Sequence, residues 1–230
     1  MDSKIEISIL IPSRRPKLLK EYMLLNSSMA KYPERIEWIV RIDDDDKESI
    51  TMLKTDNELK NNIQNLKVFI GPRVGFVGMS QTFYWLGDQA KGDILIPFGD
   101  DLKSVKQDWD EVIYALVYLN KTPIVIGDYH FVVICSKDIF KDIWTDNCDM
   151  ADLLIVEEAE KRGILIKSPY LFEIRRDIAS VLRCGWRPES QVLLDLYEQK
   201  LNMKNMDDFT LEELMGKRST LVERLKQLRK

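Results

Sequence analysis

The chain has 230 residues, of which 45% are apolar and 31% are charged, as in an ordinary globular protein with one sizeable core. Its net charge of −4 and pI near 5.3 argue against a protein that binds nucleic acid through bulk electrostatics. Three widely spaced cysteines and one histidine argue against a zinc site and predict reduced thiols in a cytoplasmic protein. The charged residues 1–6 predict no signal peptide, and no apolar run approaches the roughly 20 residues that a membrane span needs.

Strands and helices are predicted to alternate along the first half of the chain. Short apolar runs bounded by turn residues predict four strands, over 5–11, 37–42, 66–70 and 94–98. A helix is expected after Pro16, a polar stretch of helix and loop over 47–65, and a helix capped by Ser80 that ends at Ala90. This alternation is typical of βαβ units and therefore of a parallel sheet.

The second half is expected to continue the α/β pattern. An apolar stripe predicts a buried helix over 109–119, and further helices are expected over 136–144 and 149–162, the last closed by Gly163. Strands are predicted over 123–127, 131–135, 164–166 and 170–174. Beyond Arg175 the composition changes, which predicts a helical C-terminal extension over 176–230.

Polar side chains follow each of the first four predicted strands. In chain order they are Arg14 and Arg15, Asp43 and Asp44, Arg73, and Asp100 and Asp101. The carboxyl ends of parallel strands meet at one edge of a sheet, where open α/β sheets bind their ligands. Adjacent carboxylates there suit a hard divalent cation and its phosphate ligand, and a solvated acidic turn is the plain alternative.

A longer pattern joins these segments: ISILIPSRRP at 7–16, a strand that ends in DDDD, a glycine turn, a helix, AKGD at 90–93, and GDDL at 99–102. The pattern resembles the family 2 glycosyltransferases of the GT-A fold, well over 5–101 and more loosely as far as Gly163. The resemblance implies a mostly parallel central sheet flanked by helices. Within the catalytic domain, 1–175, residues 1–101 would form the nucleotide-sugar-binding half and 102–175 the acceptor-side half.

The resemblance also implies a metal site after the fourth strand. Carboxylates of the family's "DxD" element hold Mn²⁺ or Mg²⁺ against the diphosphate of the nucleotide-sugar. Gly99 stands at the first acidic position of that element in this chain. Asp101 is therefore the first choice as the metal ligand, with Asp100 facing the ribose or the metal.

The remaining donor contacts follow from the same resemblance. The carboxylate that contacts the base falls on Asp43 or Asp44, and the basic residue after the third strand falls on Arg73. The loop after the first strand, with Pro12, Ser13 and Arg15, would lie against the nucleotide.

A catalytic carboxylate opens a later helix in this family, about eleven residues before a glycine. Asp152 stands eleven residues before Gly163, with Ala151 where a glutamate is usual. Asp149, three residues earlier, is the alternative base.

These residues match what glycosyl transfer requires. Metal and guanidinium groups stabilise the departing diphosphate, and a positioned carboxylate removes the proton of the attacking hydroxyl. The prediction is a metal-dependent, inverting glycosyltransferase with a UDP- or GDP-sugar donor and a hydroxyl acceptor. A sugar-1-phosphate nucleotidyltransferase is less favoured because SRRP lacks glycine, and Gly99 with Ala151 leaves a non-catalytic nucleotide-sugar-binding protein open.

The C-terminal segment, the tryptophans and the histidine each allow a structural and a functional interpretation. Residues 217–230 carry six basic side chains and one acidic, with leucines at heptad-like spacing. They predict a helix on the domain or a homodimer seam, with a weak membrane-surface contact as the alternative. Trp85 and Trp109 are predicted to be core residues, whereas Trp144 is either core or the floor of an acceptor-sugar site. His130 is expected to be structural, with a phosphate contact as the minor alternative.

Overall fold

The computed structural model describes residues 4–74, 78–100, 102–119, 125–127, 133–144, 151–167 and 171–174. Asp101, His130, Asp149 and the extension over 176–230 lie outside the described residues, as do Cys148 and Cys184. No helix in the described ranges is long and apolar enough to cross a membrane.

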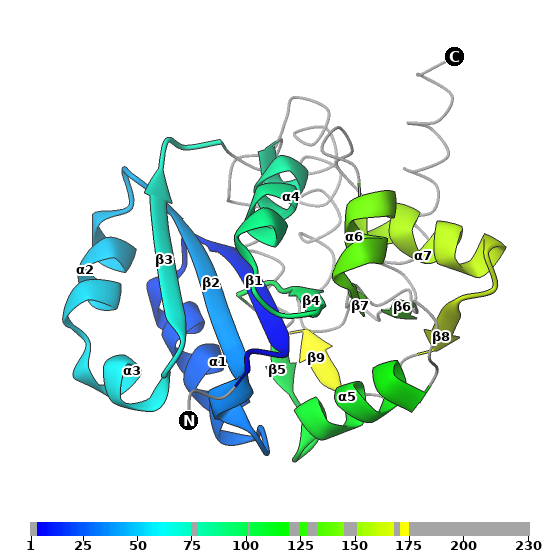
Figure 1. The fold of residues 1–230 in the computed structure, drawn as a ribbon. Helices are drawn as coiled ribbons and strands as arrows, with labels where there is room; N and C mark the ends of the chain where they lie inside the picture. The colour runs from blue at the N-terminus through cyan, green and yellow to red at the C-terminus, as the bar shows by residue number, and fades with distance from the viewer. Residues whose placement is uncertain are drawn as a thin grey trace, which may run out of the picture. The chain divides into compact units, whose positions relative to one another are not determined.

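A seven-stranded sheet in the order β3-β2-β1-β4-β7-β6-β8 forms the centre of the fold (Figure 1). Its strands are β1 (Ile7–Ser13), β2 (Ile36–Asp43), β3 (Leu66–Gly71), β4 (Ile94–Pro97), β6 (Val125–Gly127), β7 (Val133–Ser136) and β8 (Leu165–Lys167). All neighbouring pairs are parallel except those made by β7, which runs against both β4 and β6. The predicted α/β class with a mostly parallel sheet is confirmed.

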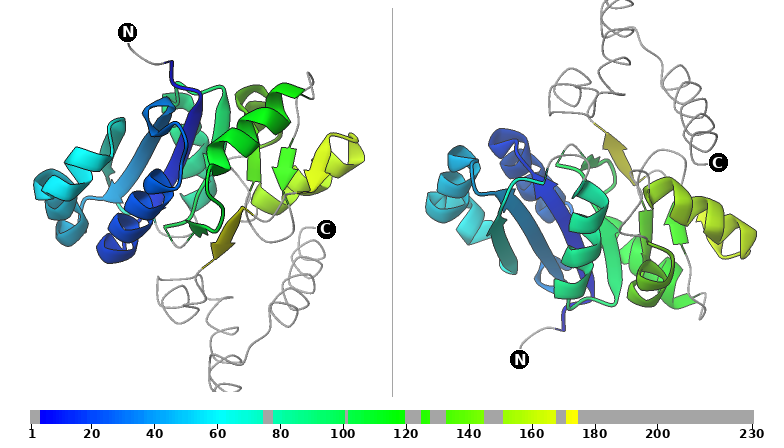
Figure 2. Two further views of the ribbon diagram at one scale, coloured as in Figure 1. Left: turned by 90° about the horizontal axis from the view of Figure 1, so that it is seen from below. Right: turned by 90° about the horizontal axis from the view of Figure 1, so that it is seen from above.

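Helices cover both faces of this sheet (Figures 1 and 2). One face carries α1 (Pro16–Ser28), α2 (Lys47–Thr55), α3 (Asn57–Asn62) and α5 (Trp109–Leu119), and the other carries α4 (Met79–Gln89), α6 (Lys137–Ile143) and α7 (Ala151–Lys161). The short 3-10 helix η1 (Pro33–Arg35) leads into β2.

The two hydrophobic cores follow from the alternation of side chains along the strands. In β1, Ile9 and Ile11 pack with the α1 and α5 side, whereas Leu10 packs with Leu86 of α4 and Phe140 of α6. Because successive side chains of a strand point to opposite faces, a strand buried on both faces must be apolar throughout. The run over 94–98, predicted to be such a strand, is buried along its whole length.

The first strand extends two residues beyond its predicted end, and Pro12 lies inside it. Leu10 accepts a hydrogen bond from the N–H of Phe98 at 2.8 Å, which is the last backbone bond between β1 and the β4 side. Pro12, two residues later, faces the same neighbour after β4 has ended at Pro97. No ladder bond therefore needs the N–H that proline lacks.

Helix starts in the polar segments depend on aspartate caps. Asp46 accepts from the N–H of Ser49 at 3.1 Å to begin α2, and Asp56 accepts from the N–H of Leu59 at 3.0 Å to begin α3. The prediction that Ser80 caps the next helix is wrong. The N-cap of α4 is Gly78, and Ser80 is a buried residue inside the first turn.

A second, two-stranded sheet lies within the predicted half 102–175 and is tied to α1 of the other half. It pairs β5 (Leu102–Ser104) with β9 (Phe172–Ile174), and β5 is a strand that the sequence did not predict. Asn26 of α1 donates to the carbonyl of Leu102 at 3.0 Å and accepts from the N–H of Ser104. The indole N–H of Trp109 donates to the Asn26 carbonyl at 2.9 Å, so buried hydrogen bonds tie α1 to β5 and α5.

Candidate functional site

The carboxyl ends of β1, β2, β3 and β4 bring together most of the predicted donor-site residues. β1 lies between β2 and β4, so the loop after β1 reaches the strand ends on both sides. The result is two clusters of charged side chains. We call them the β4 cluster (Ser13, Arg15 and Asp100) and the β2 cluster (Arg14, Arg41, Asp43, Asp45 and Arg73).

The β4 cluster is held by Asp100, whose side chain is only 6% exposed. The hydroxyl of Ser13 donates to Oδ2 of Asp100 at 2.5 Å, and the guanidinium of Arg15 donates to Oδ1. Ser13 also accepts from the backbone N–H of Arg15 at 3.1 Å, which fixes the turn out of β1. Both oxygens of the buried carboxylate are therefore bonded within the protein.

The β2 cluster is centred on Asp43, a buried carboxylate at the end of β2. Arg14 lies 2.6 Å from Oδ2 of Asp43, and Arg41 lies 2.5 Å from Oδ1. Arg14 also lies 2.7 Å from Asp45 and so bridges the two carboxylates. The hydrogen bonds that Arg14 donates to Asp45 and Asp43 raise the pKa of Arg14 well above its ordinary value, and the bond to Asp45 lowers the pKa of that carboxyl group.

Arg73 and Asp44 are more loosely placed than the sequence suggested. Arg73 is half exposed and reaches Asp45 at 3.7 Å, an ion pair that contributes little in water. Asp44 donates its backbone N–H to the carbonyl of Gly71 at 2.8 Å, and its side chain is exposed. Pro12 lies half buried in β1, one residue before the β4 cluster.

Sequence reasoning missed Arg41. Its guanidinium bonds both Asp43 and the carbonyl of Pro72, and so links the end of β2 to the end of β3. A signal was present in the sequence, because an arginine between the buried residues Val40 and Ile42 of a buried strand needs a partner.

No ready divalent-metal site exists among the described residues. No group of three or more histidine, cysteine, aspartate or glutamate side chains in those residues could hold a metal ion. Asp100, the described member of the predicted pair, uses both oxygens for Arg15 and Ser13. The residues as arranged therefore do not fit a divalent cation at Asp100.

The predicted catalytic carboxylates are placed in part. Asp152 is the second residue of α7, so a helix does begin where the candidate base was expected. The helix packs against α6 and against β6, β7 and β8. The roles of Asp152 and Asp149 stay predictions.

Three tryptophans confirm one expectation, correct a second and decide between two alternatives for the third. Trp109 is fully buried, as predicted, but Trp85 is 42% exposed and only packs edge-on against Phe69. Trp144 is 4% exposed, stacks on Phe140 and donates its indole N–H to the carbonyl of Ser80 at 3.1 Å. Trp144 is therefore a core residue and not the floor of a sugar site.

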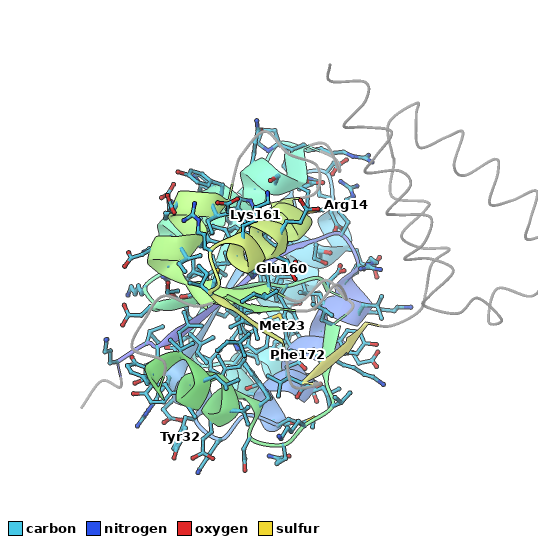
Figure 3. The ribbon with its side chains drawn as sticks, turned by 90° about the vertical axis from the view of Figure 1, so that its right-hand side faces the viewer. Arg14, Met23, Tyr32, Glu160, Lys161 and Phe172 are labelled. Carbon is cyan, nitrogen blue, oxygen red and sulfur yellow. The ribbon has the colours of Figure 1, made fainter. Side chains whose placement is uncertain are left out.

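A shallow cavity of about 160 Å³ lies at the opposite edge of the sheet, where β1 and β2 begin. Tyr32, Tyr114 and Arg35 line it together with carboxylates. In the side view of Figure 3, Arg14 and Tyr32 lie toward opposite ends. The cavity is thus separate from the two clusters at the carboxyl edge.

Comparisons with known proteins place the fold among glycosyltransferases. The sequence matches no protein-family model and no curated protein. The structure is similar to a mannosyltransferase of Pyrobaculum calidifontis solved with GDP-Man and Mn²⁺, with a TM-score of 0.59 and 10% identity over 73% of this chain and 55% of that chain. It is also similar to S. aureus TarS, with a TM-score of 0.59 and 15% identity over 91% of this chain and 46% of that chain.

A shorter form of TarS, residues 1–349 in complex with UDP-GlcNAc, matches with a TM-score of 0.55 and 14% identity over 91% of this chain and 78% of that chain. The chain spans about half the length of the mannosyltransferase and of full TarS. At these identities the likeness concerns the fold, and the chain has the fold of nucleotide-sugar glycosyltransferases.

Proposed function

We propose that the protein is a glycosyltransferase that moves a sugar from a nucleoside-diphosphate sugar to a hydroxyl acceptor. The observation that carries the proposal is the pair of charged clusters at the carboxyl edge of β1, β2, β3 and β4, where α/β sheets bind ligands. The fold supports it, since the similar structures include complexes with GDP-Man, UDP and UDP-GlcNAc.

The β2 cluster is proposed to recognise the nucleoside. Asp43 is already held by Arg14 and Arg41, which fix the direction of its carboxylate. A fixed carboxylate selects N–H donors such as those on the edge of uracil or guanine. Asp44, exposed beside it, is the second candidate for this contact.

The β4 cluster is proposed to face the diphosphate. As the sugar leaves, negative charge builds up on the diphosphate, and the guanidinium groups of Arg15 and Arg73 would stabilise it. The loop from Pro12 to Arg15 would lie against the nucleotide, with Ser13 holding the turn. Mn²⁺ or Mg²⁺ at Asp101 and Asp100 stays part of the proposal, although Asp100 as arranged has both oxygens bonded to Ser13 and Arg15.

The acceptor hydroxyl needs a base, and Asp152 is the first candidate with Asp149 as the second. One base acting opposite the leaving group predicts a single displacement with inversion at the anomeric carbon. If Asp152→Asn and Asp149→Asn each keep the full transfer rate, neither residue is the base.

The test is a binding and turnover panel on the full chain. UDP, GDP and their sugars are added with Mn²⁺, with Mg²⁺ or with EDTA, and thermal stability and release of nucleoside diphosphate are measured. We expect stabilisation by one nucleotide, loss of it in Asp43→Asn, and an unchanged response in Asp88→Asn, an exposed carboxylate paired with Lys141. Absence of stabilisation by every nucleotide would refute the proposal.

A non-catalytic nucleotide-sugar-binding protein is the second candidate. The observation that favours it is Asp100, because both of its oxygens are bonded to Ser13 and Arg15. Stabilisation by a nucleotide-sugar with no release of nucleoside diphosphate, under any metal condition, identifies this alternative.

A further inference from the structure

β3 is the outermost strand of the seven-stranded sheet, and among the described strands it pairs only with β2 (Figure 1). The carbonyls of Asn65 and Gly71 both accept hydrogen bonds from N–H groups on the β2 side, at 2.8 Å. Backbone groups alternate in direction along a strand, so the odd-numbered residues of β3 bond β2. The backbone N–H and C=O groups of Leu66, Val68 and Ile70 therefore point to the open edge.

Apolar side chains gather beside this edge. Four of the six large hydrophobic side chains that are exposed among the described residues lie here: Val68, Ile70, Val74 and Trp85, which we call the β3 edge patch. Val68 and Ile70 belong to β3, and Val74 follows it. Trp85 of α4 reaches the strand from the other face, where its ring packs edge-on against Phe69 at 4.9 Å. The open backbone groups are thus bordered by apolar surface.

The edge lacks the usual protection against pairing. Soluble proteins guard edge strands with charged side chains, with proline or with a covering element. β3 contains one charged residue, Lys67, and no proline. The ammonium of Lys67 lies 2.6 Å from Glu37 and donates to the carbonyl of Gln89 at 3.2 Å, so it is held by its own chain. Its charge does not guard the edge.

The helices on the neighbouring face leave the edge open. Val68 and Ile70 stand in register with Val40 and Ile42 of β2, whose side chains belong to the core on the side of α1, α2 and α3. Val68 is nonetheless 37% exposed and Ile70 46% exposed. α2 and α3 therefore do not cover the outer strip of β3, and a further strand can approach it.

A second copy of the chain fits this edge in an antiparallel register. When Val68 lies opposite Val68 of the second copy, Leu66 lies opposite Ile70, and Ile70 lies opposite Leu66. All three outward residues then form hydrogen-bonded pairs, and each pair exchanges two N–H···O bonds. A two-fold axis relates the two copies, as in most soluble dimers.

The neighbouring registers are poorer. A shift by two residues in one direction places Lys67 opposite Lys67 of the second copy, and like charges directly opposite one another destabilise a sheet. A shift in the other direction places Leu66 opposite Pro72, which has no N–H to donate. In the register centred on Val68, Lys67 lies opposite Phe69. The edge is therefore complementary to itself in hydrogen bonds and in charge.

We propose that β3 pairs antiparallel with β3 of a second copy and joins the two sheets into one, with Val68 beside the two-fold axis. The pairing satisfies the outward backbone groups and covers the exposed side chains of β3. The surface is distinct from residues 217–230, for which the sequence predicted a homodimer seam. The proposal concerns assembly and does not depend on the proposed function.

The first test measures self-association of the full chain by sedimentation velocity over a range of protein concentrations. Val68→Lys places two ammonium groups opposite each other. Val68→Pro removes an N–H that faces away from β2, so the ladder within the sheet is kept. Val105→Lys is the matched control, because Val105 is also 37% exposed and lies directly after β5, away from β3.

We expect wild type and Val105→Lys to form the same reversible dimer. Both Val68 variants should raise the Kd of the dimer about 10-fold or more, since each change acts twice across the two-fold axis. Circular dichroism verifies that each variant is folded.

The second test reads the register. Val68→Cys should form a disulfide-linked dimer under mild oxidation, because Cα atoms of a hydrogen-bonded antiparallel pair are about 5.5 Å apart, within reach of a disulfide. Ile70→Cys is the matched control, since the two Ile70 positions lie four residues apart along the strands, roughly 14 Å. Wild type under the same oxidant controls for the native cysteines.

Three outcomes overturn the proposal. Wild type that stays monomeric at high concentration shows that a second copy does not occupy the edge, which is then available to a strand of a different protein. A dimer equally strong in Val68→Lys and Val68→Pro locates the association on another surface, residues 176–230 included. Equal crosslinking of Val68→Cys and Ile70→Cys refutes the register. If a Lys or Pro variant does not fold, the two cysteine variants still decide.

Discussion

Glu37, a buried carboxylate near the start of β2, offers a sharp test of how the sheet is held together. Its side chain is 1% exposed. It accepts hydrogen bonds from the Ser8 hydroxyl at 2.6 Å and from the N–H groups of Lys91 and Gly92, and it pairs with Lys67 at 2.6 Å. These donors come from the starts of β1 and β3 and from the turn before β4, so one side chain links four neighbouring strands.

Glu37→Gln keeps the shape, removes the charge and turns an amide N–H toward the ammonium of Lys67. A hydrogen bond to a charged group contributes about 1.5–3 kcal/mol, so we expect a loss of about 2–3 kcal/mol in the free energy of unfolding. For a domain of this size the loss corresponds to a drop in Tm of about 4–12 °C. Glu111→Gln is the matched control, because Glu111 pairs with Lys31 at the surface, where such pairs contribute about 0–1 kcal/mol.

The effect has a defined pH dependence. Burial raises the pKa of Glu37, but Lys67, Ser8 and the Lys91 N–H outweigh it, and the pKa in the folded protein is below the ordinary value of 4.5. The stabilisation is therefore complete above pH 4.5 and is lost as the pH falls through the folded-state pKa. Urea unfolding of both proteins from pH 7 to pH 3 should show the gap between wild type and Glu37→Gln closing at the acid end. A gap below 0.5 kcal/mol at pH 7, or one that does not change with pH, would refute the reasoning.

Three further predictions concern buried groups elsewhere. Gly87→Ala should lower the free energy of unfolding by about 1–3 kcal/mol, because the new Cβ would lie 2.7 Å from the ring of Phe140. Urea titration measures the change, and an unchanged unfolding midpoint would contradict this packing. Asp110→Asn should lower the free energy of unfolding by about 1–3 kcal/mol in the same assay. Asp110 is buried and accepts hydrogen bonds from the backbone N–H groups of Lys31 at 2.7 Å and Tyr32 at 2.8 Å. Wild-type stability of the variant would show that these bonds are dispensable. Burial raises the pKa of the Cys135 thiol, so the thiol should react slowly with iodoacetamide in the folded protein. At pH 8, mass spectrometry should find Cys135 unlabelled in the folded protein and labelled in urea. Rapid labelling of the folded protein would place the thiol at the surface.

The sequence predicted the elements whose pattern is local. The apolar runs of β1, β2 and β4 are long enough to be recognised as strands, and the turn residues after them identified the carboxyl edge of the sheet, where the candidate site lies. β5 escaped prediction because three residues carry no usable period, and its partner β9 lies about 70 residues away in the chain. The antiparallel direction of β7 was not predicted either. A short apolar run has the same sequence pattern whether its strand runs parallel or antiparallel to its neighbour.

The candidate site shows the same limit. The residue types were identified from the strand ends, but their pairing depends on strand order, which places β1 between β2 and β4. That order brings Arg15 to Asp100 and Arg14 to Asp43. The sequence around Arg14 and Arg15 does not indicate that these adjacent arginines pair with carboxylates at the ends of two different strands.

The hydrogen bonds of Asn26 bear on how this protein can move. They join α1 to β5, and Trp109 at the start of α5 completes the same junction against the ring of Phe172. A hinge between α1 and the β5–β9 sheet would have to break these bonds and expose the rings of Trp109 and Phe172 to water. Among the described residues, these contacts therefore oppose hinge motion at the junction of α1 with β5 and α5.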